Sequence, residues 1–142
     1  MQRYLALILS LWVGAVQAQM TLACQFREGN GFTWKSGQWQ PQRFSPEKPF
    51  FLTIGPDKRL DPKSALLAMG SSPEMAESSK SDPSWVHCLR HSKAANSTAC
   101  AHYSGDSVTV SLTTLEGAVS KISGVTNKVD DIAVMPFVCQ KM

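Results

Sequence analysis

Four cysteines constrain the fold of this 142-residue chain more than any other feature. They are Cys24, Cys88, Cys100 and Cys139. An even number of cysteines in an exported chain predicts two disulfide bonds, although four cysteines allow three pairings. Cys88 and Cys100 flank a short polar segment rich in small residues, which favours a hairpin closed by a disulfide. Cys24 and Cys139 are then left to join the first and last strands of the domain.

The amino terminus, "MQRYLALILSLWVGAVQAQM", predicts that these cysteines lie outside the cytoplasm. Arg3 precedes an apolar run, and Val16-Gln17-Ala18 supplies small residues at the two positions that signal peptidase reads. We therefore predict a secretory signal peptide over 1–18, cleaved after Ala18, and export to the periplasm or the medium. A membrane anchor is the first alternative, but the run is shorter than the roughly 20 apolar residues that a spanning helix needs. A lipoprotein modified at Cys24 is the second alternative.

The charge of the chain excludes one class of partner. The net charge is +3, and the basic residues are scattered and form no stripe, so we expect no nucleic-acid partner. After the signal peptide no apolar segment is long enough to span a membrane, so no membrane span is expected. The oligomeric state stays open.

Alternating apolar and polar residues predict a mainly β domain over 19–142. "MTLACQF" places Leu22, Cys24 and Phe26 on one face, and "GFTWKSGQWQ" predicts a hairpin with Ser36-Gly37 as its loop and Trp34 opposite Trp39. "DSVTVSLTTL" also alternates, "LEG" predicts a turn, and "AVSKISG" predicts the next strand. In the last strand, "DIAVMPFVCQ", Pro136 has no N–H, which predicts a sheet edge or a bulge there.

One short helix is predicted over 61–70. Asp61 suits the N-cap, Pro62 suits the first helical position and Gly70 suits a left-handed end, while Leu66, Leu67 and Met69 are expected to pack one side. The polar segment 71–84 is interpreted as a loop. About eight short strands and this helix predict a single-domain antiparallel barrel or two-sheet sandwich.

The three histidines, His87, His91 and His102, raise the possibility of a metal or catalytic site. If Cys88 lies opposite Cys100, then Val86 faces His102, and His87 points to the other side of the sheet from His102. The histidines then do not converge, and oxidised sulfurs cannot act as thiolate ligands, so neither a metal nor a cofactor is expected. Catalytic motifs are also missing, which predicts a protein that is not an enzyme. A small hydrolase using His87 or His91 as a base is the alternative.

Two stretches, "GFTWKSGQW" and "DDIAVMPFVCQ", resemble small uncharacterised exported proteins of bacteria with short β-rich cores and paired cysteines. The resemblance covers both ends of the mature chain, and its motifs are structural. It implies a compact disulfide-bonded β domain and carries no functional residue over.

These observations predict a binding, inhibitor or immunity-type module of the cell envelope. Its partner is expected to be an envelope protein, a sugar or a small apolar ligand, the last in a small-ligand-binding β-barrel. Trp34 and Trp39 are candidate binding residues, as an aromatic platform for a sugar or peptide, although a pair that only pins the hairpin is favoured. The segment 71–84 and the hairpin tip from His91 to Asn96 are the other candidate contacts, because recognition concentrates in loops on a rigid scaffold.

Overall fold

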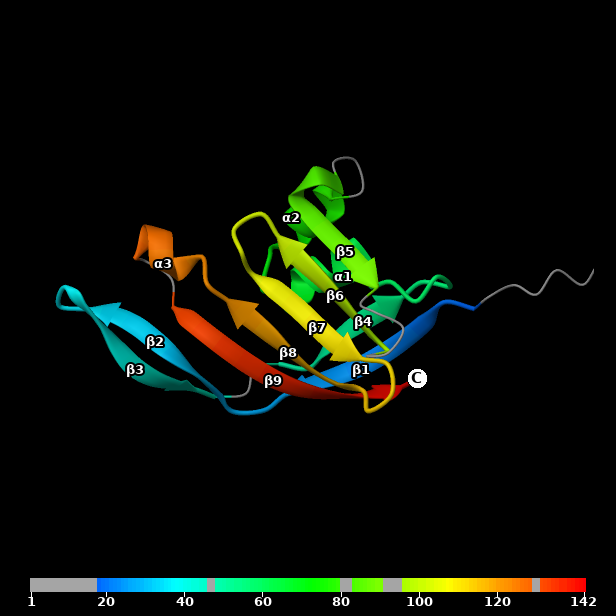
Figure 1. The fold of residues 1–142 in the computed structure, drawn as a ribbon, viewed down its shortest axis with the longest axis horizontal. Helices are drawn as coiled ribbons and strands as arrows, with labels where there is room; N and C mark the ends of the chain where they lie inside the picture. Colours follow the sequence, from blue (N-terminus) through cyan, green and yellow to red (C-terminus); the bar gives the residue numbers. More distant parts are fainter. Residues whose placement is uncertain (1–17, 46–47, 80–82, 91–95, 129–130) are drawn as a thin grey trace, which may run out of the picture.

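The last strand of the chain, β9 (Ile132–Lys141), lies in the middle of a single antiparallel sheet (Figure 1). A computed structural model describes residues 18–142 except 46–47, 80–82, 91–95 and 129–130. Its other strands are β1 (Met20–Phe26), β2 (Gly29–Lys35), β3 (Gln38–Phe44), β4 (Phe50–Ile54), β5 (Val86–Arg90), β6 (Ser97–His102), β7 (Ser107–Ser111) and β8 (Glu116–Lys121). Its helices are α1 (Pro62–Ala68), α2 (Pro73–Ser78), α3 (Gly124–Asn127) and the 3-10 helix η1 (Pro83–Trp85).

The neighbours of β9 explain how the two ends of the domain meet. The sheet runs β3-β2-β9-β8-β7-β6-β5, and β1 pairs with β9 on one side and with β4 on the other. The predicted pairing of the first strand with the last is therefore confirmed. The mainly β, antiparallel fold class is confirmed as well, with nine strands among the described residues where about eight were expected.

Strands β1 and β2 follow one another along the same side of β9, with a bulge between them. Phe26 lies opposite Phe137 and Asn30 opposite Val134, so three residues of the β1–β2 segment face two residues of β9. The carbonyl of Pro136 points to this bulge and accepts a hydrogen bond from Arg27 N at 2.8 Å. The nitrogen of Pro136 points to the same side as its carbonyl, toward the bulge. The absence of an N–H on Pro136 therefore removes no hydrogen bond from the ladder between β9 and β8. The predicted bulge is confirmed, whereas the alternative of an edge strand is wrong because β9 is central.

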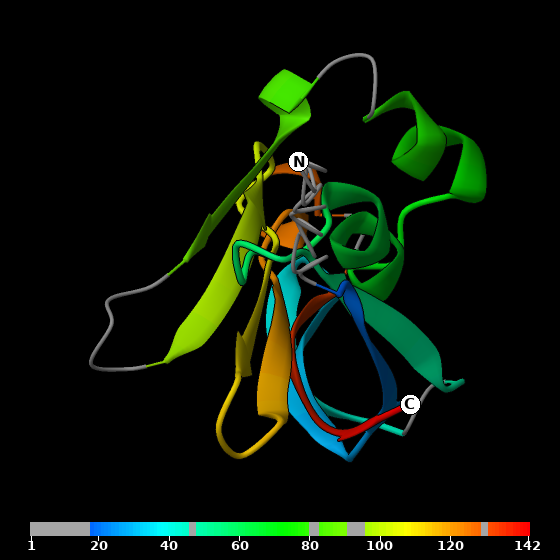
Figure 2. The same cartoon turned by 90° about the vertical axis from the view of Figure 1, so that its right-hand side faces the viewer.

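The core fills the concave side of the sheet. Leu22, Leu52, Val108, Val119 and Phe137 are completely or almost completely buried there. Helix α1 packs beside the open side of the curled sheet, in contact with β4, β5 and β6 (Figure 2). Strands β4 and β5 do not pair with each other, so the sheet does not close. The barrel alternative is therefore wrong, and the architecture is sandwich-like.

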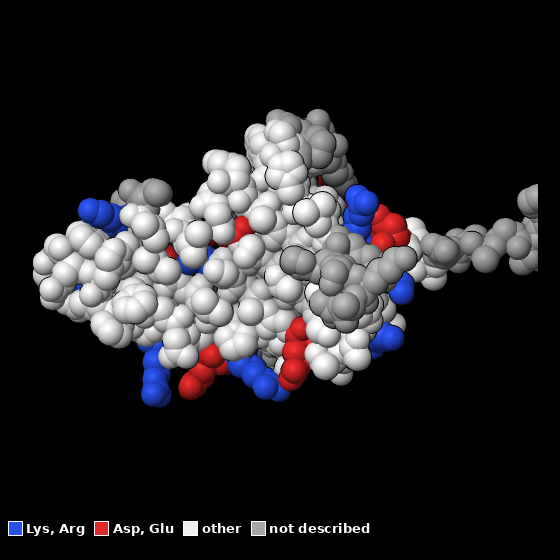
Figure 3. Space-filling view, in the orientation of Figure 1, with Lys and Arg blue, Asp and Glu red and all other residues white. Residues whose placement is uncertain are grey.

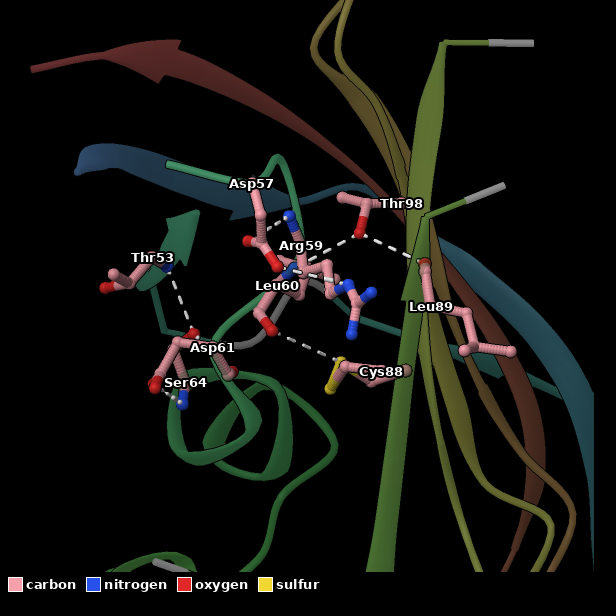
Figure 4. The surroundings of a disulfide bond; sticks show 10 residues. Thr53, Asp57, Arg59, Leu60, Asp61, Ser64, Cys88, Leu89 and Thr98 are labelled. Carbon is pink, nitrogen blue, oxygen red and sulfur yellow. Dashed lines mark hydrogen bonds and ion pairs between the residues drawn. A yellow bond between two sulfur atoms is a disulfide. The ribbon is translucent and has the colours of Figure 1, made fainter. Parts of the chain in front are cut away.

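The segment between β4 and α1 covers the gap between β4 and β5 and is held there by buried side-chain contacts (Figure 4). Thr98 of β6 is fully buried, and its hydroxyl accepts a hydrogen bond from Leu60 N at 3.1 Å and donates one to Leu89 O at 3.3 Å. A buried hydroxyl would destabilise the fold if it lacked partners. Thr98 therefore links the β4–α1 connection to the hairpin of β5 and β6.

Both predicted disulfides are confirmed. Cys24 is bonded to Cys139 and Cys88 to Cys100, and in each case the two residues lie directly opposite one another in adjacent strands. The predicted register of the second hairpin, with Val86 opposite His102, is also correct. Two disulfides suit an oxidising, exported environment.

The helical regions match the prediction in part. Asp61 caps α1 by accepting from Ser64 N at 2.9 Å, and Gly70 has a positive φ of 87°, as predicted. The prediction that Leu66, Leu67 and Met69 pack on one side is wrong for Leu67. Leu67 is 39% exposed, whereas Leu66 and Met69 are buried.

Two segments predicted as irregular contain regular structure. The loop predicted over 71–84 is wrong, because it contains α2 and the start of η1, and Ser72 caps α2 by accepting from Met75 N at 3.2 Å. Ser72-Pro73 is the same cap-and-proline signal as Asp61-Pro62 and was missed within a polar stretch. The turn predicted at "LEG" lies slightly earlier, with Leu115 at a positive φ of 58°, so Glu116 and Gly117 already belong to β8.

Candidate functional site

A cleft of about 500 Å³ opens on the concave side of the sheet, beside α1 and α2. One wall is mainly apolar and the other is polar. The apolar wall is formed by Phe44, Met69, Met75, Ala133 and Met135. The polar wall is formed by Ser71, His102, Ser104, Asp106, Lys121, Ser123 and Asp131.

The apolar wall combines a fixed base with an adaptable rim. Met69 and Met135 are buried, whereas Met75 on α2 is 41% exposed. Methionine is unbranched and polarizable, so such a wall adapts to ligands of different shape. Gly29 allows β2 to approach Met135 closely, since a Cβ at position 29 would lie only 2.2 Å from the Met135 sulfur.

Helix α2 brings a carboxylate close to the rim at Met75. Glu74 lies in the first turn of α2, where a hydrogen bond with its own backbone and then one with the Ser72 hydroxyl lower the pKa of its carboxyl from the ordinary value. Glu74 is therefore ionised at neutral pH. A negative charge at a helix N-terminus is favourable, so Glu74 stabilises the first turn of α2.

The polar wall begins with the tight turn that joins β6 to β7. His102 N donates to Asp106 O at 2.8 Å, and Gly105 N donates to His102 O at 2.9 Å. The Nδ1 atom of His102 makes two contacts with Ser104. It lies 2.7 Å from the hydroxyl oxygen, and it accepts a hydrogen bond from Ser104 N at 3.3 Å. Because Nδ1 accepts from a backbone N–H, the neutral ring carries its proton on Nε2.

Asp106 holds the other half of the polar wall in place. Its carboxylate accepts hydrogen bonds from Ile122 N at 2.8 Å, from Ser123 N at 3.0 Å and from the Ser123 hydroxyl at 3.2 Å. These bonds join the β6–β7 turn to the segment between β8 and α3. Within the polar wall, His102 is therefore held by Ser104, and Asp106 by Ser123.

The contact between Ser104 and His102 has part of the geometry of a nucleophile and its base. In a catalytic triad the second ring nitrogen of the histidine is held by a carboxylate. Here Nε2 of His102 is buried and has no hydrogen-bond partner among the residues that the structure describes. The pair is two residues apart in a turn, so its contact is explained by turn geometry alone.

The two tryptophans lie outside the cleft. Their rings are 5.2 Å apart at an interplanar angle of 70°, and the Lys128 ammonium lies 4.6 Å from the ring centroid of Trp34. The predicted register, with Trp34 opposite Trp39, is confirmed. Two rings at this angle form no common flat platform for a sugar, so the geometry favours a pair that pins the hairpin.

The structure does not bring the remaining candidate residues into the cleft. His87 is exposed on the convex side of β5. Asn96 precedes β6, at the end away from His102, and its amide donates to Thr113 Oγ1 at 3.0 Å. His91 lies outside the described residues. Of the predicted contact segment 71–84, Ser71 and Met75 do line the cleft.

Sequence reasoning missed most of the cleft. Its lining comes from β3, α1, α2, the β6–β7 turn, the β8–α3 connection and β9, which are distant in the chain. The only local signal was the helix start at Ser72-Pro73, which would have predicted an ordered Met75. The other lining residues carry no motif.

Fold and cleft define the class of this protein: a mainly β, doubly disulfide-bonded domain with one curled sheet and a ligand-sized cleft. Comparison with protein-family models, with curated proteins and with solved structures finds no match for this chain. Within the described part of the chain, no three His, Cys, Asp or Glu side chains gather in a way that could hold a metal ion. No helix in that part is long and apolar enough to cross a membrane.

Proposed function

We propose that this protein is an exported binding module without enzymatic activity, and that the cleft is its binding site. The observation that carries the proposal is the pairing of a methionine-rich wall with a polar wall around about 500 Å³. Small-molecule sites have this size range and this combination of apolar surface with a few polar groups. The two disulfides support the proposal, because they suit a protein of the periplasm or the medium.

The lining indicates the chemistry of the ligand. An apolar group of the ligand packs against Met69, Met75 and Met135, and its polar edge faces Ser71 and the β6–β7 turn. A small amphipathic molecule fits this description, and so does a side chain that an envelope protein inserts. The inhibitor or immunity role corresponds to the second case.

The hydrolase alternative has less support than the binding proposal. His87, one of the two bases considered for it, lies on the convex side of the sheet, away from the cleft. The Ser104–His102 pair in the cleft has no described carboxylate at Nε2 to orient the ring.

Methionine methyl groups provide a direct test. In protein labelled at the methionine methyl carbons, we expect compounds that bind the cleft to shift the NMR signals of Met69, Met75 and Met135. Met20 and Met142, at the two ends of the described chain, serve as internal controls. The compounds to be screened are small fatty acids, aromatic acids, sugars and short apolar peptides.

A pair of variants makes this test specific. Ser71→Phe narrows the cleft at its rim, so we expect it to weaken every binder, whereas Ser45→Phe changes an exposed residue outside the cleft lining and leaves binding unchanged. Binders that leave the signals of Met69, Met75 and Met135 unmoved would contradict the assignment of the cleft as the binding site.

A further inference from the structure

The β2–β3 hairpin carries an apolar surface on the side of the sheet away from the cleft. Phe32 lies opposite Pro41 and Ile132, and Trp34 lies opposite Trp39, so these side chains share one face. The opposite face of the same strands carries Phe44 and Ala133, which line the cleft. We define the hairpin face as Phe32, Trp34, Trp39, Pro41, Ile132 and Val134.

The hairpin face is more apolar than the solvent side of an antiparallel sheet usually is. Phe32 is 45% exposed and Val134 is 51% exposed. Pro41, which lies beside Phe32 on the edge strand β3, is exposed as well. The solvent face of an antiparallel sheet normally alternates to polar residues. The hairpin projects at one end of the long axis of the molecule, where a flat partner can reach it (Figure 1).

The charged side chains on the hairpin face are cationic. Arg43 lies opposite Asn30 and shares this face, whereas Lys35 lies opposite Gln38 on the other face. Lys128 is the second cation, because its ammonium lies against the ring of Trp34. In Figure 3, Lys and Arg side chains border an uncharged surface at this end of the molecule. A partner of complementary charge is therefore anionic.

The open edge of the hairpin is unsuited to strand addition. Among the described strands, β3 pairs only with β2, and Pro41 near its centre has no N–H to donate from the free edge. Proline on an edge strand is a recognised barrier to pairing with another chain. A partner is therefore contacted through the side chains of the hairpin face.

We propose that the hairpin face docks this protein on the surface of an anionic lipid bilayer. Trp and Phe are favoured at the membrane–water interface, and Lys and Arg are attracted to anionic headgroups. The protein then lies on the membrane without crossing it, with the cleft on the opposite side of the sheet and still open. This site is separate from the cleft, so its test is independent of the cleft ligand.

The test uses the purified exported protein carrying Trp85→Phe. Of the four tryptophans of the chain, Trp12 lies in the predicted signal peptide, so the fluorescence of this variant reports on Trp34 and Trp39 alone. The probes are vesicles of phosphatidylglycerol with phosphatidylethanolamine, and vesicles of phosphatidylcholine. We expect a blue shift of emission and co-sedimentation with the anionic vesicles, at least about fivefold weaker binding to phosphatidylcholine, and loss of binding as salt increases.

Three variants separate docking from unspecific adhesion. Phe32→Ser combined with Val134→Ser should reduce anionic vesicle binding about tenfold, because the apolar contact is removed. Arg43→Glu combined with Lys128→Glu should abolish the preference for anionic lipid, because both cations of the hairpin face are reversed. Phe51→Ser, at a phenylalanine that is 56% exposed on β4, is the matched control and should bind like the parent protein.

Three results would overturn the proposal. The first is no binding to anionic vesicles, and the second is equal binding by the Phe32/Val134 variant and the Phe51 control. The third is a dimer in sedimentation that Phe32→Ser dissociates in the absence of vesicle binding, since a second copy would then cover this face. Near-parental circular dichroism of each variant confirms that the fold is retained.

Discussion

Gly117 shows at the scale of one residue how closely the sheet of this protein is packed. A Cβ at this position would lie 2.2 Å from the carbonyl oxygen of Thr109 and 2.3 Å from Cζ of Phe137. Backbone and a buried ring cannot both move away, so we expect Gly117→Ala to lower the free energy of unfolding by about 2–3 kcal/mol. Urea denaturation measures this change.

Gly55→Ala is the control for this substitution. A Cβ at position 55 would meet Asp57 Oδ1 at 3.0 Å, and that atom is the end of an exposed side chain that can turn away. We expect a loss of less than about 1 kcal/mol. If Gly117→Ala were no more destabilising than Gly55→Ala, the position of Gly117 inside β8 would be wrong.

The histidines give a second contrast between single residues. His87 is exposed, so His87→Ala should change the free energy of unfolding by less than about 0.5 kcal/mol. His102 fixes the β6–β7 turn through Ser104, so His102→Ala should cost about 1–2 kcal/mol. Parallel denaturation curves of the two variants test the difference, and a larger loss at His87 would contradict it.

At the scale of elements, the two disulfides should differ in what they stabilise. Cys24 and Cys139 are separated by 115 residues, whereas Cys88 and Cys100 are separated by 12. In the chain-entropy model the longer loop contributes about 4–5 kcal/mol and the shorter one about 3 kcal/mol. Double substitution of each pair by alanine should therefore be more destabilising for Cys24 and Cys139.

Denaturation of the two double variants measures this order, and peptide mapping without reductant confirms the pairing in the parent protein. A peptide joining Cys24 to Cys88 or Cys100 would contradict both the pairing and the hairpin of β5 and β6.

Sequence reasoning on elements succeeded where the signal was local. Asp61-Pro62 and Gly70 correctly predicted where α1 begins and ends, because capping and positive φ are properties of neighbouring residues. Ser36-Gly37 set the register that places Trp34 opposite Trp39, since a two-residue loop fixes the pairing on both sides of it. Helix α2 was missed because its polar composition concealed the signal at Ser72-Pro73.

At the scale of the whole molecule, export is the prediction on which the rest depends. We expect the exported product to begin at Gln19 and to carry no lipid, since Val16-Gln17-Ala18 suits signal peptidase and Cys24 is bonded to Cys139. The intact mass of the exported protein measures both features. A mass that includes diacylglycerol on Cys24 would contradict the cleavage site and the terminal disulfide together.

The sequence by itself determined the strand class, the faces of the strands and both disulfides of this protein. Alternation with a period of two assigns each side chain to a face, so Leu22, Cys24 and Phe26 were correctly placed on the buried side. The short segment between Cys88 and Cys100 favoured their pairing as a hairpin, which left Cys24 for Cys139. These conclusions need only neighbouring residues or a simple elimination.

Only the tertiary structure decided which strands are neighbours and where the cleft lies. Alternation is the same for a central and an edge strand, so nothing local placed β9 between β8 and the consecutive strands β1 and β2. That choice depends on how the buried faces pack together, and packing involves residues far apart in the chain. The cleft follows from the same packing, because Phe44, Met75 and Met135 meet only after the sheet has curled around α1.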